Sequence, residues 1–184
     1  MTKKLYLTDA QLKSETERCL NCPEKPCKKA CPANCSPADF IQAAKPRTNE
    51  SYVKAAEEIL KANPLGQMCG LTCPDRFCMA ACSRKNLDSS IRIPAVQAAL
   101  LEKARKLGGV SAPAPVAPNG KNVAIVGAGP AGMAAPAVLA RKGYSITLFE
   151  AANKVGGAAK LIPEARLPQE VTEKDWNYIK TFGD

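Results

Sequence analysis

Two runs of cysteine carry most of the chemistry available to this chain of 184 residues. The first run is spaced C-x2-C-x4-C-x3-C-P, and the second is spaced C-x3-C-x4-C-x3-C. Thiols this close together cannot all pair as disulfides, but they can surround an inorganic cluster. The spacing therefore favours iron–sulfur clusters. The first run consists of Cys19, Cys22, Cys27 and Cys31, and the second of Cys69, Cys73, Cys78 and Cys82.

Zinc is the main alternative for these thiols, because C-x2-C pairs bind tetrahedral zinc well. Two features weigh against it. The chain has no histidine, and the x4-x3 spacing before Pro32 is typical of the ferredoxin class, in which one cysteine of a run ligates the other cluster. Disulfides are less favoured still. A ninth cysteine, Cys35, leaves the number of ligands open.

A glycine-rich segment in the second half of the chain predicts a nucleotide site. An apolar strand, expected to be buried, spans 123–126, a helix is expected over 131–142, and a second strand spans 145–150. Strand, glycine loop, helix, strand and terminal acid follow the order of a dinucleotide-binding fold. The alternative is a glycine turn that only packs a helix against a strand. The candidate nucleotide contacts are Gly127, Gly129, Pro130, Ala131, Gly132 and Glu150.

Each part of this segment has a physical role in the prediction. Gly127 permits a tight turn, Gly129 allows the backbone to approach a pyrophosphate, and Gly132 allows the helix to pack closely. The helix N-terminus then offers backbone N–H groups to the phosphates, and Glu150 is placed to accept hydrogen bonds from a ribose. Pro136 is expected to kink the helix. The pair Gly156-Gly157, six residues after the acid, is similar to the flavoprotein form of the fold and favours FAD over NAD.

The helices and strands that must position these residues divide the chain into two predicted domains joined by a linker. Helices are expected over 8–18, from a capping Ser36 and Pro37 onward, over 51–62 and over 94–107. We therefore predict an α-helical domain over residues 1–107 that binds two [4Fe–4S] clusters, with a thin core that needs metal to fold. A Pro/Ala linker spans 108–120. Residues 121–184 are predicted to form an incomplete α/β Rossmann-like unit of the FAD type.

The charge and hydropathy of the chain restrict where the protein is located and what it binds. The formal net charge is +9, but the basic residues are scattered and aromatic residues are few, which disfavours nucleic-acid binding. No apolar run is long enough for a transmembrane helix, and the N-terminus lacks the apolar stretch of a signal peptide. We expect a cytoplasmic protein, in which thiols stay reduced. The basic residues expected near anionic clusters are Lys25, Lys28, Lys29, Arg76, Arg84 and Lys85.

The order of these motifs resembles the N-terminal part of dihydropyrimidine dehydrogenase. It is also similar to the small subunit of NADPH-dependent glutamate synthase. The resemblance runs from about residue 15 to Pro168 and includes Asn63-Pro64-Leu65-Gly66, Ile91-x-Ile93-x3-Gln97 and Ile162–Pro168 besides the cysteines and the βαβ segment. It implies two [4Fe–4S] clusters with crossed ligation. One would be held by Cys19, Cys22, Cys27 and Cys82, and the other by Cys31, Cys73, Cys78 and the side-chain oxygen of Gln97.

The resemblance also implies different roles for individual residues of the site. Gln97 indicates the dihydropyrimidine dehydrogenase type, since the glutamate synthase type has an acid there; without the resemblance it would be read as a surface helix residue. Cys69 becomes a non-ligand near a cluster, and Cys35 a small buried or surface thiol. Arg166 is a candidate cofactor contact.

Two hypotheses about function follow. In the first, the chain is the electron-transfer module of an NAD(P)H-dependent oxidoreductase, passing electrons from FAD through two clusters to a distant reductive site. The rest of a longer polypeptide, or a partner subunit, would supply NAD(P)H binding and complete the flavin site, and the chain alone is not expected to turn over. In the second, it is a non-catalytic, cluster-stabilised assembly module. No catalytic residue is assigned, and the sequence does not identify the electron acceptor.

Overall fold

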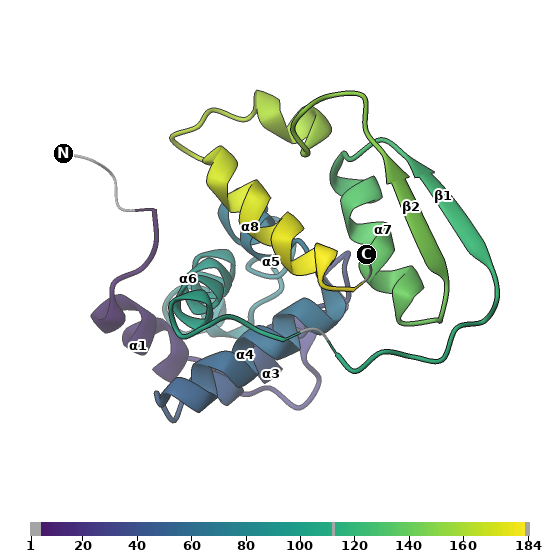
Figure 1. The fold of residues 1–184 in the computed structure, drawn as a ribbon. Coiled ribbons are helices and arrows are strands. Elements are labelled where there is room, and N and C mark those ends of the chain that lie inside the picture. The colour runs from purple at the N-terminus through teal and green to yellow at the C-terminus, as the bar shows by residue number, and fades with distance from the viewer. Residues whose placement is uncertain (1–4, 112, 183–184) are drawn as a thin grey trace. The chain divides into compact units, whose positions relative to one another are not determined.

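A computed structural model of the chain describes residues 5–111 and 113–182. The chain forms two compact units, residues 1–110 and 111–184 (Figure 1). The first unit is helical and the second contains a small parallel sheet, which confirms the predicted fold class. Among the described residues, no helix has the length and apolar character needed to cross a membrane.

The first unit is a set of short helices joined by the cysteine-bearing loops. Its core is formed by apolar side chains of α3, α4 and α6, with Phe40, Ile59 and Leu100 fully buried. In chain order the helices are α1 (Asp9–Glu17), α2 (Pro26–Lys29), α3 (Pro37–Ala44), α4 (Asn49–Ala62), α5 (Gly66–Thr72), the 3₁₀ helix η1 (Ser83–Asn86) and α6 (Ile93–Lys106).

Capping interactions set where several of these helices begin. Thr8 and Gln11 form the predicted capping box at the start of α1. Thr48 caps α4 by accepting a hydrogen bond from the backbone N–H of Ser51. Ser36 is the N-cap residue of α3 and Pro37 its first helical residue, as predicted, but the Ser36 side chain makes no capping hydrogen bond.

Helix α5 was not expected from the sequence, and it packs tightly on α6. The helix spans only seven residues and carries Cys69, so part of the second cysteine run is helical rather than a loop. A Cβ atom on Gly70 would lie 2.7 Å from the backbone nitrogen of Ala98 and 2.9 Å from its Cα. Glycine at this position therefore allows the two helices to approach backbone to backbone.

We predict that Gly70→Ala destabilises the first unit by about 2 kcal/mol, because the added methyl meets backbone that cannot move aside. Gly66→Ala is the matched control on the same helix. Its Cβ would meet the side-chain ends of Ile59 and Leu101, which can shift, so a smaller loss is expected. Urea unfolding followed by circular dichroism measures both; equal losses would contradict the prediction.

The second unit is built on a parallel pair of strands. Strand β1 (Asn122–Val126) pairs in register with β2 (Ser145–Phe149), and α7 (Pro130–Ala140) connects them. The 3₁₀ helix η2 (Gly157–Leu161) and α8 (Gln169–Lys180) follow. Pro136 lies inside α7, as expected, whereas α8 was not predicted.

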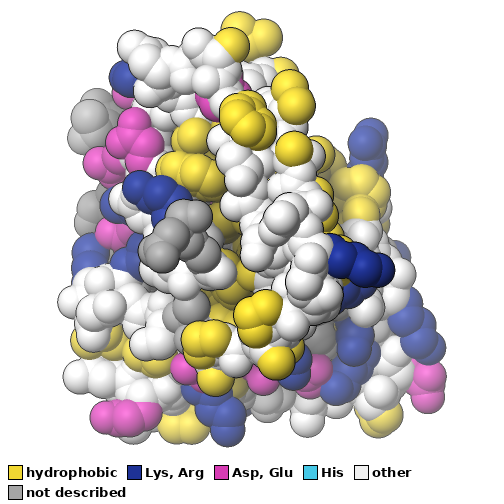
Figure 2. Space-filling view, turned by 45° about the vertical axis from the view of Figure 1, so that its right-hand side comes forward, with side chains coloured by type: hydrophobic (Ala, Val, Ile, Leu, Met, Phe, Trp, Pro, Cys, Tyr) yellow, Lys and Arg dark blue, Asp and Glu magenta, His cyan; other side chains and the backbone are white. Residues whose placement is uncertain are grey.

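The prediction that the first strand is buried is wrong. Exposure alternates along both strands, and Val126 and Phe149 are 88% and 55% exposed. Helix α7 packs against β2, so one set of alternating side chains is partly covered while the other set is not. Figure 2 shows hydrophobic side chains on the surface of the molecule. The large exposed hydrophobic residues of this unit are Val116, Val126, Val138, Phe149 and Leu161.

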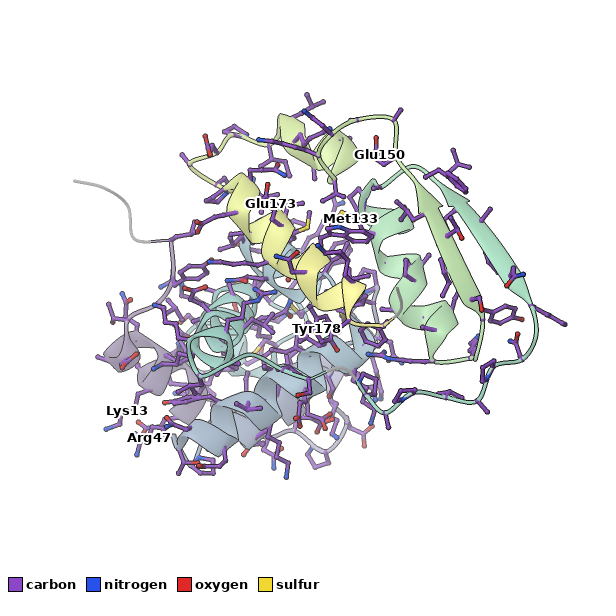
Figure 3. All side chains as sticks on the ribbon, in the orientation of Figure 1. Lys13, Arg47, Met133, Glu150, Glu173 and Tyr178 are labelled. Carbon is purple, nitrogen blue, oxygen red and sulfur yellow. The ribbon has the colours of Figure 1, made fainter. Side chains whose placement is uncertain are left out.

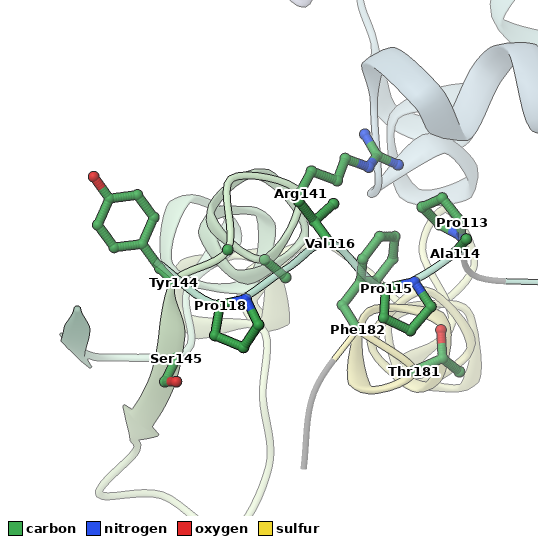
Figure 4. A pocket seen from close by; sticks show the side chains of 12 residues that line it. Pro113, Ala114, Pro115, Val116, Pro118, Arg141, Tyr144, Ser145, Thr181 and Phe182 are labelled. Atoms are coloured by element: carbon green, nitrogen blue, oxygen red, sulfur yellow. The ribbon is translucent and has the colours of Figure 1, made fainter. Parts of the chain in front are cut away.

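The proline-rich segment at the start of this unit lies against its own helices. A pocket is lined by Pro113, Ala114, Pro115, Val116 and Pro118, together with residues at the end of α7 and just after α8 (Figure 4). The guanidinium of Arg141 stacks on the ring of Phe182 there, 5.0 Å from its centre. None of the predicted cofactor contacts lines this pocket.

Candidate functional site

Four cysteines from the two runs line one pocket in the first unit. Cys19 follows α1, Cys22 lies in the next loop, Cys27 is on α2, and Cys82 immediately precedes η1. The pocket thus combines three thiols of the first run with one of the second. The remaining lining is largely apolar and consists of Leu20, Pro26, Pro37, Ala38, Ile41, Ser83, Arg84, Ile91 and Ile93.

The pKa of the Cys27 thiol reflects the proximity of the other cysteines in this pocket. Burial raises the pKa of its thiol, and the neighbouring Cys19 and Cys82 raise it further. Each thiolate in such a group disfavours ionisation of the others until a cation is present. A metal centre that binds deprotonated sulfur would remove this repulsion and release protons.

The other cysteines of the two runs form a second group of neighbouring thiols. Burial, and then the charge of Cys31, raises the pKa of Cys78 to about 11. The pKa of Cys73 is lowered, chiefly because the Cys69 thiol donates a hydrogen bond to it. Cys31 and Cys78 also act on Cys73, so the three proposed thiol ligands of the second cluster are electrostatic neighbours.

Cys35 belongs to this second group, which the sequence did not indicate. It is 2% exposed, and its neighbours include Cys31, Cys78 and Cys69. Burial and these thiols raise its pKa to about 12. Of the two interpretations of Cys35, a buried thiol is the correct one.

Gln97 is buried on α6, at 8% exposure, so its interpretation as a surface helix residue is wrong. Its side-chain amide nitrogen donates a hydrogen bond of 2.6 Å to the carbonyl oxygen of Gly66, the first residue of α5. The same short helix leads into Cys73. This bond uses one of the two N–H donors of the amide and orients the group, with the side-chain oxygen as its acceptor for another contact.

The donor sets fit clusters in their chemistry. Among the residues that the structure describes, no group of three or more His, Cys, Asp or Glu side chains is placed to hold a metal ion. A four-iron cluster is larger than an ion and separates its ligands more widely. The relevant observation is therefore the shared pocket, whose sulfur donors and apolar surroundings suit an iron–sulfur cluster.

In the second unit, the glycine loop lies between β1 and α7. Gly129 precedes α7, and Pro130 occupies its first turn. A Cβ atom on Gly132 would lie 1.9 Å from the carbonyl oxygen of Gly127, so the close packing of helix and loop requires glycine there. The arrangement presents a helix N-terminus at the end of a parallel strand, as a pyrophosphate site requires.

Glu150 ties this loop to the segment that follows β2 (Figure 3). One carboxylate oxygen accepts a hydrogen bond of 2.6 Å from the N–H of Ala128, and the other accepts one of 2.8 Å from the N–H of Ala152. These bonds lower the pKa of Glu150. The backbone N–H of Gly156 donates to the carbonyl of Ala128 at 2.7 Å, so the Gly156-Gly157 pair closes on the same loop.

We predict that Glu150→Ala weakens binding of ADP, the half shared by FAD and NAD, by about tenfold or more, because a charged acceptor that orders the loop is lost. A carboxylate has further lone pairs for a ribose hydroxyl beyond those it uses here. Calorimetric titration of the full chain measures the change. Glu164→Ala, which removes an exposed acid of the same unit, is the control; an effect equal to that of Glu150→Ala would contradict the assignment.

The structure gives less specific support to the other residues predicted to contact a cofactor or a cluster. Arg166 is exposed in the turn before α8, where its backbone N–H bonds to Pro163. Lys25 pairs with Asp39 at 2.6 Å, and Lys29 pairs with Glu24 at 3.2 Å. Of the basic residues expected near the clusters, Arg84 lines the first thiol pocket itself.

Comparison with known proteins identifies both halves of the chain. Residues 2–108 match the family model described as dihydropyrimidine dehydrogenase domain II, 4Fe-4S cluster. Residues 125–184 match the model of an NAD(P)-binding Rossmann-like domain. The first match covers more than half of the chain.

Curated relatives agree with these matches. The chain is 36% identical over 171 residues to the NAD-dependent dihydropyrimidine dehydrogenase subunit PreT of Escherichia coli K12, covering 92% of this chain and 40% of that protein. Identity to PreT of Salmonella typhimurium is 35% over 171 residues, with the same coverage. It is 32% over 167 residues to the glutamate synthase [NADPH] small chain of E. coli K12, covering 89% of this chain and 34% of that protein. The chain thus spans well under half the length of these relatives.

Proposed function

The chain belongs to the dihydropyrimidine dehydrogenase domain II, 4Fe-4S cluster family, and we propose from this that it is an electron-transfer module of an NAD(P)H-dependent oxidoreductase. The observation that carries the proposal is the single pocket shared by Cys19, Cys22, Cys27 and Cys82. Thiols of both runs meet there, as crossed ligation requires. The chain would hold and tune redox groups, while the redox chemistry belongs to those groups.

The proposed ligands form two sets. Cys19, Cys22, Cys27 and Cys82 would hold the first [4Fe–4S] cluster, and Cys31, Cys73, Cys78 and Gln97 would hold the second. Burial of Gln97 and the bond from its amide nitrogen to Gly66 support an oxygen donor at a fixed position. A neutral amide in place of a thiolate makes a cluster less negative, which is one way to adjust its reduction potential.

The nucleotide proposed for the second unit is FAD. The glycine loop, Glu150 and Gly156-Gly157 would hold its ADP part, and Arg166 is a further candidate contact. NAD(P)H would bind through another part of a longer polypeptide or through a partner subunit. The relatives' names, which specify pyrimidine reduction and glutamate synthesis, suggest the range of final acceptors. The proposal places the chain in the cytoplasm, where thiols that bind clusters stay reduced.

Metal analysis tests the number of clusters. Two four-iron clusters predict about eight irons and eight sulfides per chain after anaerobic purification. A value below about six irons would refute the two-cluster proposal. Eight irons that are not reduced through FAD even when the part that completes the flavin site is present would favour the assembly-module alternative.

Paired substitutions test the ligand sets. Cys82→Ala should remove or alter one cluster's electron paramagnetic resonance signal, and Gln97→Ala should alter only the other, because each residue serves a different cluster. Cys69→Ala is the control: it removes a thiol of the second group that is not a proposed ligand, and it should leave two clusters. Identical spectral changes in the first two variants would refute the crossed assignment.

A further inference from the structure

A network of charged side chains joins the two loops that carry the first thiol pocket. Asp88 accepts hydrogen bonds from Arg84 through both carboxylate oxygens, at 2.8 Å from Nε and 2.7 Å from Nη2. One of these oxygens also accepts from Arg18 Nη2 at 3.1 Å. One carboxylate therefore links two guanidinium groups from distant parts of the chain. We call Arg18, Asp88 and Arg84 the arginine clamp.

The Arg18 arm of the clamp is held from a second side. Arg18 Nη1 donates to Glu15 at 3.1 Å, and the same Glu15 oxygen accepts from the backbone N–H of Arg92. Arg18 also donates to the side chain of Ser89 at 2.8 Å. Glu15 is buried, so this arm is anchored in the body of the unit. Several bonds of fixed geometry distinguish the network from a single surface ion pair, which usually contributes little.

The clamp lies directly beside the cysteines. Arg18 immediately precedes Cys19, and Arg84 follows Cys82 by two residues. Arg84 lines the same pocket as the four thiols, and its Nη1 lies 3.4 Å from the carbonyl oxygen of Arg18. Fixing the two arginines on one carboxylate therefore fixes the distance between the loop that begins at Cys19 and the loop that contains Cys82.

We propose that Asp88 is a positioning residue for the first cluster: it holds Cys19 and Cys82 on the same pocket and keeps the charge of Arg84 facing it. The inference rests on the cluster-binding function proposed above. A cluster becomes more negative when it is reduced, so a guanidinium at its edge favours the reduced form and raises the reduction potential. Asp88 thus acts on the cluster through geometry, and Arg84 acts through charge.

The positioning role predicts that Asp88→Asn makes the first cluster labile. Iron loss to a chelator from that cluster, identified by the signal that Cys82→Ala removes, should be about fivefold faster, while the second cluster is unchanged. Asp9→Asn is the matched control, since it removes an aspartate that pairs with Lys103 at 2.9 Å elsewhere in the same unit. Asp88→Glu, which keeps the carboxylate, should recover part of the loss.

The charge role is tested separately by redox titration. Arg84→Gln should shift the midpoint potential of the first cluster to a more negative value and leave that of the second in place. Arg84→Lys keeps the charge but not the planar fork, so it should restore the potential and not the slow iron loss. A general loss of folding would affect both clusters alike.

The outcomes separate this inference from the proposed function. A wild-type chain without clusters would overturn both. A wild-type chain with two clusters, combined with an Asp88→Asn variant whose first cluster keeps its stability, would overturn the clamp alone. An unchanged potential in Arg84→Gln would overturn the charge role, and equal lability in Asp88→Asn and Asp9→Asn would overturn the positioning role.

Discussion

The first thiol pocket depends on the approach of Cys82 to the loop that carries Cys19, Cys22 and Cys27. Closing so long a stretch of chain has an entropic cost, which the apolar contacts of α3, α4 and α6 help to offset. The close contact of α5 with α6 at Gly70 fixes the helix that leads into the second run. The arginine clamp then joins the two loops at their cysteine-bearing ends. The helical core thus sets the approach, and polar contacts at the loop ends set the final position.

Cysteines that are neighbours in the sequence belong to different thiol groups, which keeps the two groups close together. Cys27 and Cys31 are separated by about one helical turn of sequence, and so are Cys78 and Cys82, yet the members of each pair belong to different groups. The pKa of Cys78 is raised by both Cys31 and Cys27, so charge in one group acts on the other. Two clusters held by these ligands would exchange electrons over a short distance and would also repel each other's added charge.

Much of the fold could be predicted because its signals are local. The capping box of Thr8, the end of α4 before Asn63 and the glycine loop depend on neighbouring residues. Helix α5 was missed because seven residues with two glycines show no clear period. Burial of β1 was predicted wrongly, since an apolar run does not reveal how many faces are covered. Gln97, Cys35 and the clamp owe their environments to residues distant in sequence, such as Gly66 for Gln97 and Asp88 for Arg18.

The basic residues near the thiols differ in how they are paired with acids. Lys25 and Lys29 are each paired with an acid, so those pairs add little net field at the first pocket. In the clamp, two guanidinium groups share Asp88, and Arg18 is also paired with Glu15, so these four charges balance. Arg84 lines the pocket itself, whereas Arg18 directly precedes Cys19 in the chain. Sharing a carboxylate between two arginines therefore does what a simple ion pair does not: it fixes the two loops relative to each other and holds the Arg84 guanidinium beside the pocket, where its charge would act on a cluster that becomes more anionic when it accepts an electron.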